Sequence, residues 1–242
     1  MWKNIHEPRA ITYNQTMAKT ITHIDNDETK PALFGEADLL DFAQNHNFSQ
    51  MIFEMLTERK PSEAETKLLN LILNLSIDHG PNSPSAVATI AATKEGKTMG
   101  ESVGAGMAQI GDRHGGAGGP LMEIIYRVKN QESSIKEVVA EKLVKGERLP
   151  GLGHRVYKDL DPRAQLIMNT AVENGVGEEY VKIVNELRDE MEKQSGKSLP
   201  VNIDGAIAAV FCGFGLAPEL GIAIFIIARA PGLASHFINS SK

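Results

Sequence analysis

The stretch DGAIAAVFCGFGLAPELGIAIFIIAR, residues 204–229, decides what kind of protein this is. It is almost entirely apolar, and Pro218 and Glu219 interrupt it near the middle. Each half is well short of the roughly 20 residues that are needed to cross a bilayer. We therefore expect two buried helices, over 206–217 and 219–229, and no membrane segment.

Helical spacing of apolar residues recurs along the rest of the chain. Ser62 with Glu65 three residues later forms a capping box, which predicts a helix start. Residues 20–35 alternate weakly around a polar turn and predict a small hairpin. Further helices are expected over 49–59, 124–140, 163–174 and 178–195. No stretch alternates strands with helices, so the fold class is all-α.

Composition excludes several classes of protein. The chain has 242 residues, 42% of them hydrophobic and 23% charged, which is ordinary for a globular protein and excludes disorder. The net charge is −6, whereas a nucleic-acid-binding protein typically carries an excess of basic residues. Cys212 is the only cysteine, so it is expected as a small buried hydrophobe. The first residues lack a signal-peptide core, which favours a cytoplasmic protein.

Shifts in composition suggest the domain layout. Glycine and polar residues gather near 110–120 and again near 198–203. We expect a small subdomain over 112–200. A larger helical lobe would be formed by 20–111 and 201–242, after an extension over 1–19. A cleft between the lobes is a typical place for a small-molecule site.

Several ionisable residues stand beside glycine, where the backbone can approach a ligand closely. They are His79, His114, His154 and Asp204. A carboxylate at the mouth of an apolar helix has its pKa raised toward the range of a general base. Any one of these histidines is more often structural than catalytic. Their spacing fits no helical metal-ligand pair, and we expect no metal site.

Nucleotide-binding motifs fail on inspection. The pattern GxGxxG starting at Gly151 would need glycine at Val156. A P-loop ending at Lys97 would need glycine at Ala91. The chain is therefore not expected to bind ATP.

Three motifs carry a resemblance to a known family. GLGHRVYKDLDPRAQLI (151–167) closely resembles the signature of citrate synthase. RHGGA (113–117) resembles the first histidine motif of that family, and NIDG (202–205) resembles its catalytic aspartate motif. LSIDHGPNSPSA (75–86) looks closer to the citryl-CoA lyase module of ATP citrate lyase. The likeness runs from about Thr20 to His236 and implies a two-lobed helical fold with a truncated large lobe.

The resemblance implies a role for each matching residue. Asp204 would move the proton at the acetyl methyl carbon, His114 would stabilise the enolate oxygen, and His154 would handle the citryl hydroxyl or the oxaloacetate carbonyl. The groups that hold carboxylates would be His79, Arg163 and Arg229. The groups that meet coenzyme A would be Gly151, Leu152, Gly153 and Lys158. No cofactor would be bound permanently, because the coenzyme A thioester is itself a substrate.

The implied reaction makes or breaks the bond between acetyl-CoA and oxaloacetate, as in the tricarboxylic acid cycle. The chain is shorter than citrate synthase and ends at FINSSK (237–242), so we expect it to lack the C-terminal arm. This favours citryl-CoA lyase, whereas His114 is a synthase-like feature. A minimal citrate or methylcitrate synthase and a non-catalytic CoA-binding protein stay open. The lyase reading leaves room for a separate citryl-CoA synthetase as a partner.

Small residues crowd the stretch 85–110. They predict helices that pack very closely and more apolar surface than a short chain can cover by itself. The resemblance also implies pairing through helices. We therefore expect a homodimer or a higher homo-oligomer.

Overall fold

The computed structural model describes residues 22–24, 27–111 and 114–241. The chain divides into two compact units, Met1–Pro61 and Ser62–Lys242. The regular secondary structure of the described residues is helical apart from three two-residue strands, which confirms the all-α class. The expected extension over 1–19 lies outside the described residues. The expected small subdomain over 112–200 stays a prediction.

The first unit holds a short antiparallel sheet and two helices. The strands β1 (Thr22–His23), β2 (Leu33–Phe34) and β3 (Ala37–Asp38) pair in chain order. The pairing of β1 with β2 confirms the hairpin that the pattern at 20–35 predicts. The helices that follow are α1 (Leu39–Asn45) and α2 (Phe48–Thr57).

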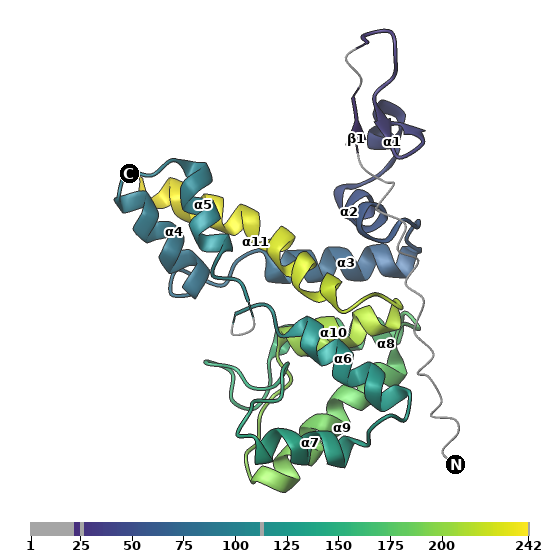
Figure 1. Cartoon of the computed structure of the whole chain (residues 1–242), viewed down its shortest axis with the longest axis vertical. Helices are drawn as coiled ribbons and strands as arrows, with labels where there is room; N and C mark the ends of the chain where they lie inside the picture. Colours follow the sequence, from purple (N-terminus) through teal and green to yellow (C-terminus); the bar gives the residue numbers. More distant parts are fainter. Residues whose placement is uncertain (1–21, 25–26, 112–113, 242) are drawn as a thin grey trace, which may run out of the picture. The chain divides into compact units, whose positions relative to one another are not determined.

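The second unit contains the remaining helices (Figure 1). They are α3 (Glu63–Ser76), α4 (Pro84–Lys94), α5 (Met99–Met107), α6 (Gly118–Lys129), α7 (Ile135–Val144), α8 (Pro162–Glu173), α9 (Glu178–Ser195), α10 (Ile203–Gly213) and α11 (Glu219–Ser240). The Ser62 side chain caps α3 and Glu65 completes the capping box, as predicted. This unit carries every predicted site residue.

One predicted helix is wrong. Residues 124–140 form parts of two helices, because α6 ends at Lys129 and α7 begins at Ile135. Gln131 takes a left-handed conformation with φ of 61°. Ser134 then opens α7 with a capping box to Glu137. The polar residues between the two helices therefore end α6 and begin α7.

The core of the second unit forms around α10. This helix packs against α6, α8 and α9, and nine of its eleven residues are buried. Cys212 is among them, and burial raises the pKa of its thiol to about 12. The thiol is therefore protonated and inert in the folded protein.

The last helix is longer than predicted. α11 continues beyond Arg229, through Pro231, to Ser240, and packs against α3, α4, α5 and α6. By length and composition alone it could span a membrane. Seven of its residues are buried in the unit, Arg229 among them. In Figure 1, α11 (yellow) runs from the neighbourhood of α10 to α4 and α5.

Small residues do bring helices close together. A Cβ atom built on Gly106 of α5 would lie 2.1 Å from Thr89 Oγ1 and 2.7 Å from the Ser85 carbonyl oxygen of α4. Only glycine fits at this crossing, in agreement with the expected close packing over 85–110.

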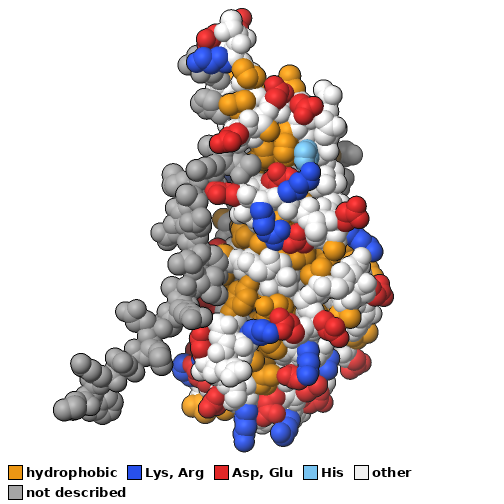
Figure 2. Space-filling view, turned by 90° about the vertical axis from the view of Figure 1, so that its right-hand side faces the viewer, with side chains coloured by type: hydrophobic (Ala, Val, Ile, Leu, Met, Phe, Trp, Pro, Cys, Tyr) orange, Lys and Arg blue, Asp and Glu red, His pale blue; other side chains and the backbone are white. Residues whose placement is uncertain are grey.

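On the face drawn in Figure 2, basic and acidic side chains are interspersed rather than segregated.

Candidate active site

Three histidines from separate motifs lie together. His79 follows α3, His114 follows α5, and His154 follows α7. The ring centroid of His79 is 5.8 Å from that of His154 and 6.2 Å from that of His114. A pocket of about 240 Å³ lies here. Its lining consists of Asp78, His79, Gly80, His154, Arg155, Val156, Tyr157 and Arg163.

His79 is neutral at pH 7. Burial, followed by the positive charges of Arg163 and Arg229, lowers its pKa to about 4. A neutral imidazole offers one hydrogen-bond donor and one acceptor. His79 can therefore contact a bound anion without adding charge to a site that already holds two guanidinium groups.

His114 is fixed by a turn and by a buried hydroxyl. Its backbone N–H donates to the Gly111 carbonyl at 2.7 Å, and its Nε2 lies 2.9 Å from the Oγ of buried Ser85. A Cβ atom on the next residue, Gly115, would lie 2.1 Å from the ring of Phe225. Burial, followed by the Arg229 charge, lowers the pKa of His114. The ring is therefore neutral and well oriented.

His154 is oriented by the backbone that follows it. Its Nδ1 accepts hydrogen bonds from the N–H groups of Val156, at 3.1 Å, and Tyr157, at 3.0 Å. A neutral ring carries one proton, which is then on Nε2. Burial and the charge of Arg163 lower the pKa of His154 and favour this neutral form. His154 thus presents a donor, Nε2–H, on the side of Arg163.

Arg163 is held by a buried carboxylate to which sequence reasoning gave no role. Asp161 accepts from Nε of Arg163 at 3.0 Å and from Nη2 at 2.7 Å, and its side chain is fully buried. Asp161 also caps α8 by accepting the backbone N–H of Arg163. An aspartate before a helix-starting proline, two residues from an arginine, is the sequence signal that could have identified this clamp.

Arg229 is the largest fully buried side chain in the described part of the chain. Its Nε donates to the Ser76 carbonyl at 3.1 Å, and its guanidinium lies 4.6 Å from the ring centroid of Phe225. Nη1 and Nη2 have no hydrogen-bond partner among the described residues. Buried charged donors of this kind are rarely left unpaired. The site is therefore prepared to receive an anion, and a carboxylate matches the guanidinium fork.

Asp204 lies in the first turn of α10, rather than just before it as predicted. Burial raises its pKa to about 6, although the charges of Arg229 and Arg163 oppose the shift. A carboxyl group with this pKa exchanges a proton near neutral pH, as a general base or acid requires. The charge of Arg229 acts on the pKa of His79, His114 and Asp204, so these groups lie near one another. The 240 Å³ pocket itself is lined by His79 but not by His114, Asp204 or Arg229.

The loop Gly151–Gly153 is joined to the start of α10. The N–H of Gly153 donates to the Pro200 carbonyl at 2.7 Å, and the N–H of Asn202 donates to the Gly151 carbonyl at 2.9 Å. Leu152 lies opposite Val201 in this bridge, and its own N–H and C=O take no part in it.

Lys158 does not line the pocket with His154 and Arg163. Its Nζ donates to the His154 carbonyl at 3.3 Å and is exposed. Among the described residues, no group of three or more His, Cys, Asp or Glu side chains is arranged to hold a metal ion. The predicted absence of a metal stays a prediction.

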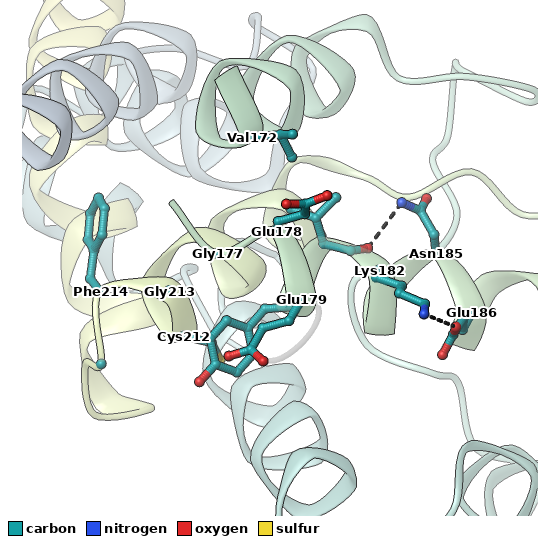
Figure 3. Close-up of a pocket in the computed structure, with 13 residues that line it drawn as sticks. Val172, Gly177, Glu178, Glu179, Lys182, Asn185, Glu186, Cys212, Gly213 and Phe214 are labelled. Atoms are coloured by element: carbon teal, nitrogen blue, oxygen red, sulfur yellow. Dashed lines mark hydrogen bonds and ion pairs between the residues drawn. The ribbon is translucent and has the colours of Figure 1, made fainter. Parts of the chain in front are cut away.

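A larger pocket, of about 1060 Å³, lies between the start of α9 and the end of α10 (Figure 3). Glu178, Glu179 and Lys182 line it together with buried Cys212, and Lys182 pairs with Glu186. None of the predicted site residues lines this pocket. The smaller pocket is the better candidate for chemistry, because it holds oriented histidines beside a clamped arginine.

The chain was compared with known proteins. It matches the family described as "Citrate synthase, C-terminal domain" over residues 1–242. It is 32% identical to citrate synthase of Heyndrickxia coagulans over 203 residues, which is 82% of this chain and 54% of that protein. It is 33% identical to citrate/2-methylcitrate synthase of Bacillus subtilis (strain 168), over 81% of this chain and 53% of that protein. The chain thus spans about half the length of these curated relatives.

Among solved structures, the chain is similar to citryl-CoA lyase from Hydrogenobacter thermophilus. The TM-score is 0.83 at 34% identity, and the match covers 92% of this chain and 86% of the other. The helical fold and the family match over residues 1–242 point to the same family. This chain belongs to the citrate synthase family.

Proposed function

We propose that the chain is a citryl-CoA lyase, which cleaves citryl-CoA to acetyl-CoA and oxaloacetate through an acetyl-CoA enolate. One observation carries the proposal. Asp204, with a pKa of about 6, lies near enough to Arg229 for the guanidinium charge to act on that pKa, and Nη1 and Nη2 of Arg229 have no partner among the described residues. A proton-transferring carboxyl group beside a carboxylate-binding guanidinium suits chemistry at the carbon next to a thioester.

The proposed cleavage uses the groups as follows. The bond between the carbinol carbon and the methylene carbon breaks, and its electron pair passes to the acetyl group as an enolate. His114 donates a hydrogen bond to the thioester oxygen, which carries the developing charge; such donors are worth about 3 kcal/mol in comparable sites. Protonated Asp204 delivers its proton to carbon. Arg163 and Arg229 hold the carboxylates of the oxaloacetate half.

His154 is the group that handles the oxygen that becomes the ketone. With Nδ1 occupied by the N–H groups of Val156 and Tyr157, its neutral ring presents Nε2–H. This form can donate to a ketone oxygen, as condensation requires. Cleavage is the same step in reverse: the hydroxyl proton passes to Nε2 as the carbon–carbon bond breaks, and the ring enters that step without hydrogen on this nitrogen.

A second candidate is a citrate or methylcitrate synthase, because the curated relatives named above bear such names. His154 does not separate the two candidates, because condensation and cleavage are the same step in opposite directions. The lyase is preferred because the match to citryl-CoA lyase covers most of both chains. A cytoplasmic location, a homo-oligomeric state and a separate citryl-CoA synthetase belong to the same proposal.

The test supplies purified protein with synthetic citryl-CoA and measures both pairs of products. We expect acetyl-CoA and oxaloacetate to form faster than citrate and free CoA, and the Asp204→Asn variant to form neither pair at a comparable rate. Predominant release of citrate and free CoA would overturn the lyase in favour of the synthase. Calorimetric binding of CoA thioesters without turnover would favour a non-catalytic CoA-binding protein.

A further inference from the structure

Helix α11 contacts the segment that leads into His79. Nε of Arg229 donates to the carbonyl oxygen of Ser76 at 3.1 Å. One turn further on, a Cβ atom on Gly232 would lie 2.3 Å from the carbonyl oxygen of Ile77. The absence of a side chain at Gly232 therefore lets the segment lie directly against the helix.

The third contact is a side-chain hydrogen bond between residues 158 positions apart. Nε2 of His236 lies 2.9 Å from Oδ1 of Asp78, and the His236 side chain is only 15% exposed. Oδ2 of Asp78 accepts the backbone N–H of Gly80 at 3.0 Å. Burial acts to raise the pKa of Asp78, but hydrogen bonds from the His79 and Gly80 backbone and from His236 outweigh it and lower the pKa.

These contacts repeat along one face of the helix. Positions 229, 232 and 236 follow the spacing that places residues above one another on a helix. They meet residues 76, 77 and 78 in order. The helix that carries Arg229 therefore also sets the position of the backbone that carries His79.

We infer that His236 and Gly232 are positioning residues, which seat His79 in the active site by fixing the 76–78 segment on α11. Neither residue lines the pocket. The consequence for oxaloacetate binding rests on the proposed function, whereas the effect on His79 itself does not.

Four variants test the inference. His236→Leu removes the donor to Asp78, and His236→Gln keeps a donor amide near the same place. Gly232→Ala adds the Cβ atom that would meet the Ile77 carbonyl and leaves His236 in place. Ser235→Ala, at an exposed position of the same helix, is the matched control.

Two measurements are made on each folded variant. Calorimetry gives the Kd for oxaloacetate and, separately, for CoA. Nuclear magnetic resonance of the histidine rings gives the pKa of His79 without any ligand. The groups that face His79 are His114, His154, Arg163 and Arg229, with Asp78 adjacent in the chain.

We expect His236→Leu and Gly232→Ala to weaken oxaloacetate binding by roughly 10- to 100-fold, because a displaced His79 would lose its hydrogen bond to a bound carboxylate, with CoA binding unchanged. The pKa of His79 should rise from about 4 toward its ordinary value as the ring becomes less buried and moves away from the two arginines. His236→Gln should restore most of both properties, and Ser235→Ala should match the wild type.

A folded His236→Leu protein with wild-type oxaloacetate affinity and an unchanged His79 pKa would overturn the inference. An equal loss of oxaloacetate affinity in His236→Gln and His236→Leu would also overturn it. If His236→Leu does not fold, Gly232→Ala decides by the same two measurements. If the wild type binds no oxaloacetate, the proposed function fails, and the His79 pKa still decides the positioning role.

Discussion

Nη2 of Arg163 lies 3.1 Å from Nε2 of His154, so two hydrogen-bond donors face each other. The backbone N–H groups on Nδ1 leave the ring proton on Nε2, and a guanidinium can only donate. Asp161 holds Arg163 from the other side and prevents it from turning away. An acceptor oxygen that lies beside the two nitrogens, within hydrogen-bond distance of each, would satisfy both donors, which is how a ketone or carboxylate oxygen would be recognised.

Arg163→Lys should therefore weaken oxaloacetate binding. Lysine keeps the charge but loses the fork, so it cannot bond Asp161 twice and also reach a ligand. We expect roughly 10- to 100-fold weaker binding by calorimetry, with CoA affinity unchanged. Arg188→Lys, which lies on α9 outside the pocket, is the control and should bind normally. Normal oxaloacetate affinity in Arg163→Lys would remove Arg163 from the carboxylate site.

Asp204→Asn should lower turnover by roughly 10²- to 10⁴-fold, with the helical circular dichroism spectrum preserved. The amide is nearly isosteric but cannot carry the proton. In the wild type, condensation should fall as the pH drops through about 6, where Asp204 takes up its proton. Cleavage should fall as the pH rises through the same value. Near-normal rates in the variant would mean that another group transfers the proton.

The stability of Asp204→Asn checks the same pKa independently. A carboxyl pKa that is raised on folding destabilises the folded state above about pH 6, and this effect is absent below about pH 4. The variant should thus gain up to roughly 3 kcal/mol over the wild type at pH 7 and little at pH 4. Chemical denaturation at both pH values measures the difference. An equal difference at both would contradict a raised pKa.

His79 should contribute in the opposite direction. Its pKa is lowered to about 4, so the folded state binds less proton than the unfolded state between about pH 4 and 6.5. The wild type therefore loses stability as the pH falls through this window. His79→Asn should gain roughly 1–2 kcal/mol over the wild type between pH 7.5 and pH 5, measured by denaturation. Parallel pH profiles for the two proteins would contradict this prediction.

Self-association should depend on the exposed face of α5. Gly100 and Gly104 are exposed, and a Cβ atom built on either meets nothing within 4 Å in the described part of the chain. A Gly104→Arg variant should dissociate the expected oligomer, because an arginine prevents close helix pairing. Light scattering should give at least twice 26.3 kDa for the wild type. Val144→Arg, at an 88% exposed position of α7, should keep the wild-type mass.

Local signals predicted much of the fold. The capping box at Ser62 and Glu65 spans four residues, so the sequence displays it directly. The break between α6 and α7 depends on a left-handed Gln131, a conformation that propensity does not favour and periodicity does not reveal. Likewise, α11 runs through Pro231 because its tertiary contacts outweigh the loss of one backbone donor.

The site was predicted as residue types but not as contacts. Histidine and aspartate beside glycine marked His79, His114, His154 and Asp204 as candidates, and the first three lie together. The partners that orient such residues come from distant segments. Ser85 lies 29 residues from His114, and His236 lies 158 residues from Asp78. Contacts between residues so far apart in the chain depend on tertiary packing, and no periodic pattern in the sequence reveals them.

The rate at which the buried Cys212 thiol at the end of α10 is alkylated can report whether a ligand is bound. Cys212 lies at the last turn of α10 and Asp204 at the first, so both belong to one cooperative helix. An alkylating reagent reaches the thiol only in molecules whose core has opened. A ligand bound at Asp204 favours the closed form by mass action and so slows alkylation in proportion to its concentration over its Kd. Because the chain has a single cysteine, the labelling rate of the unmodified protein can rank candidate substrates without an activity assay.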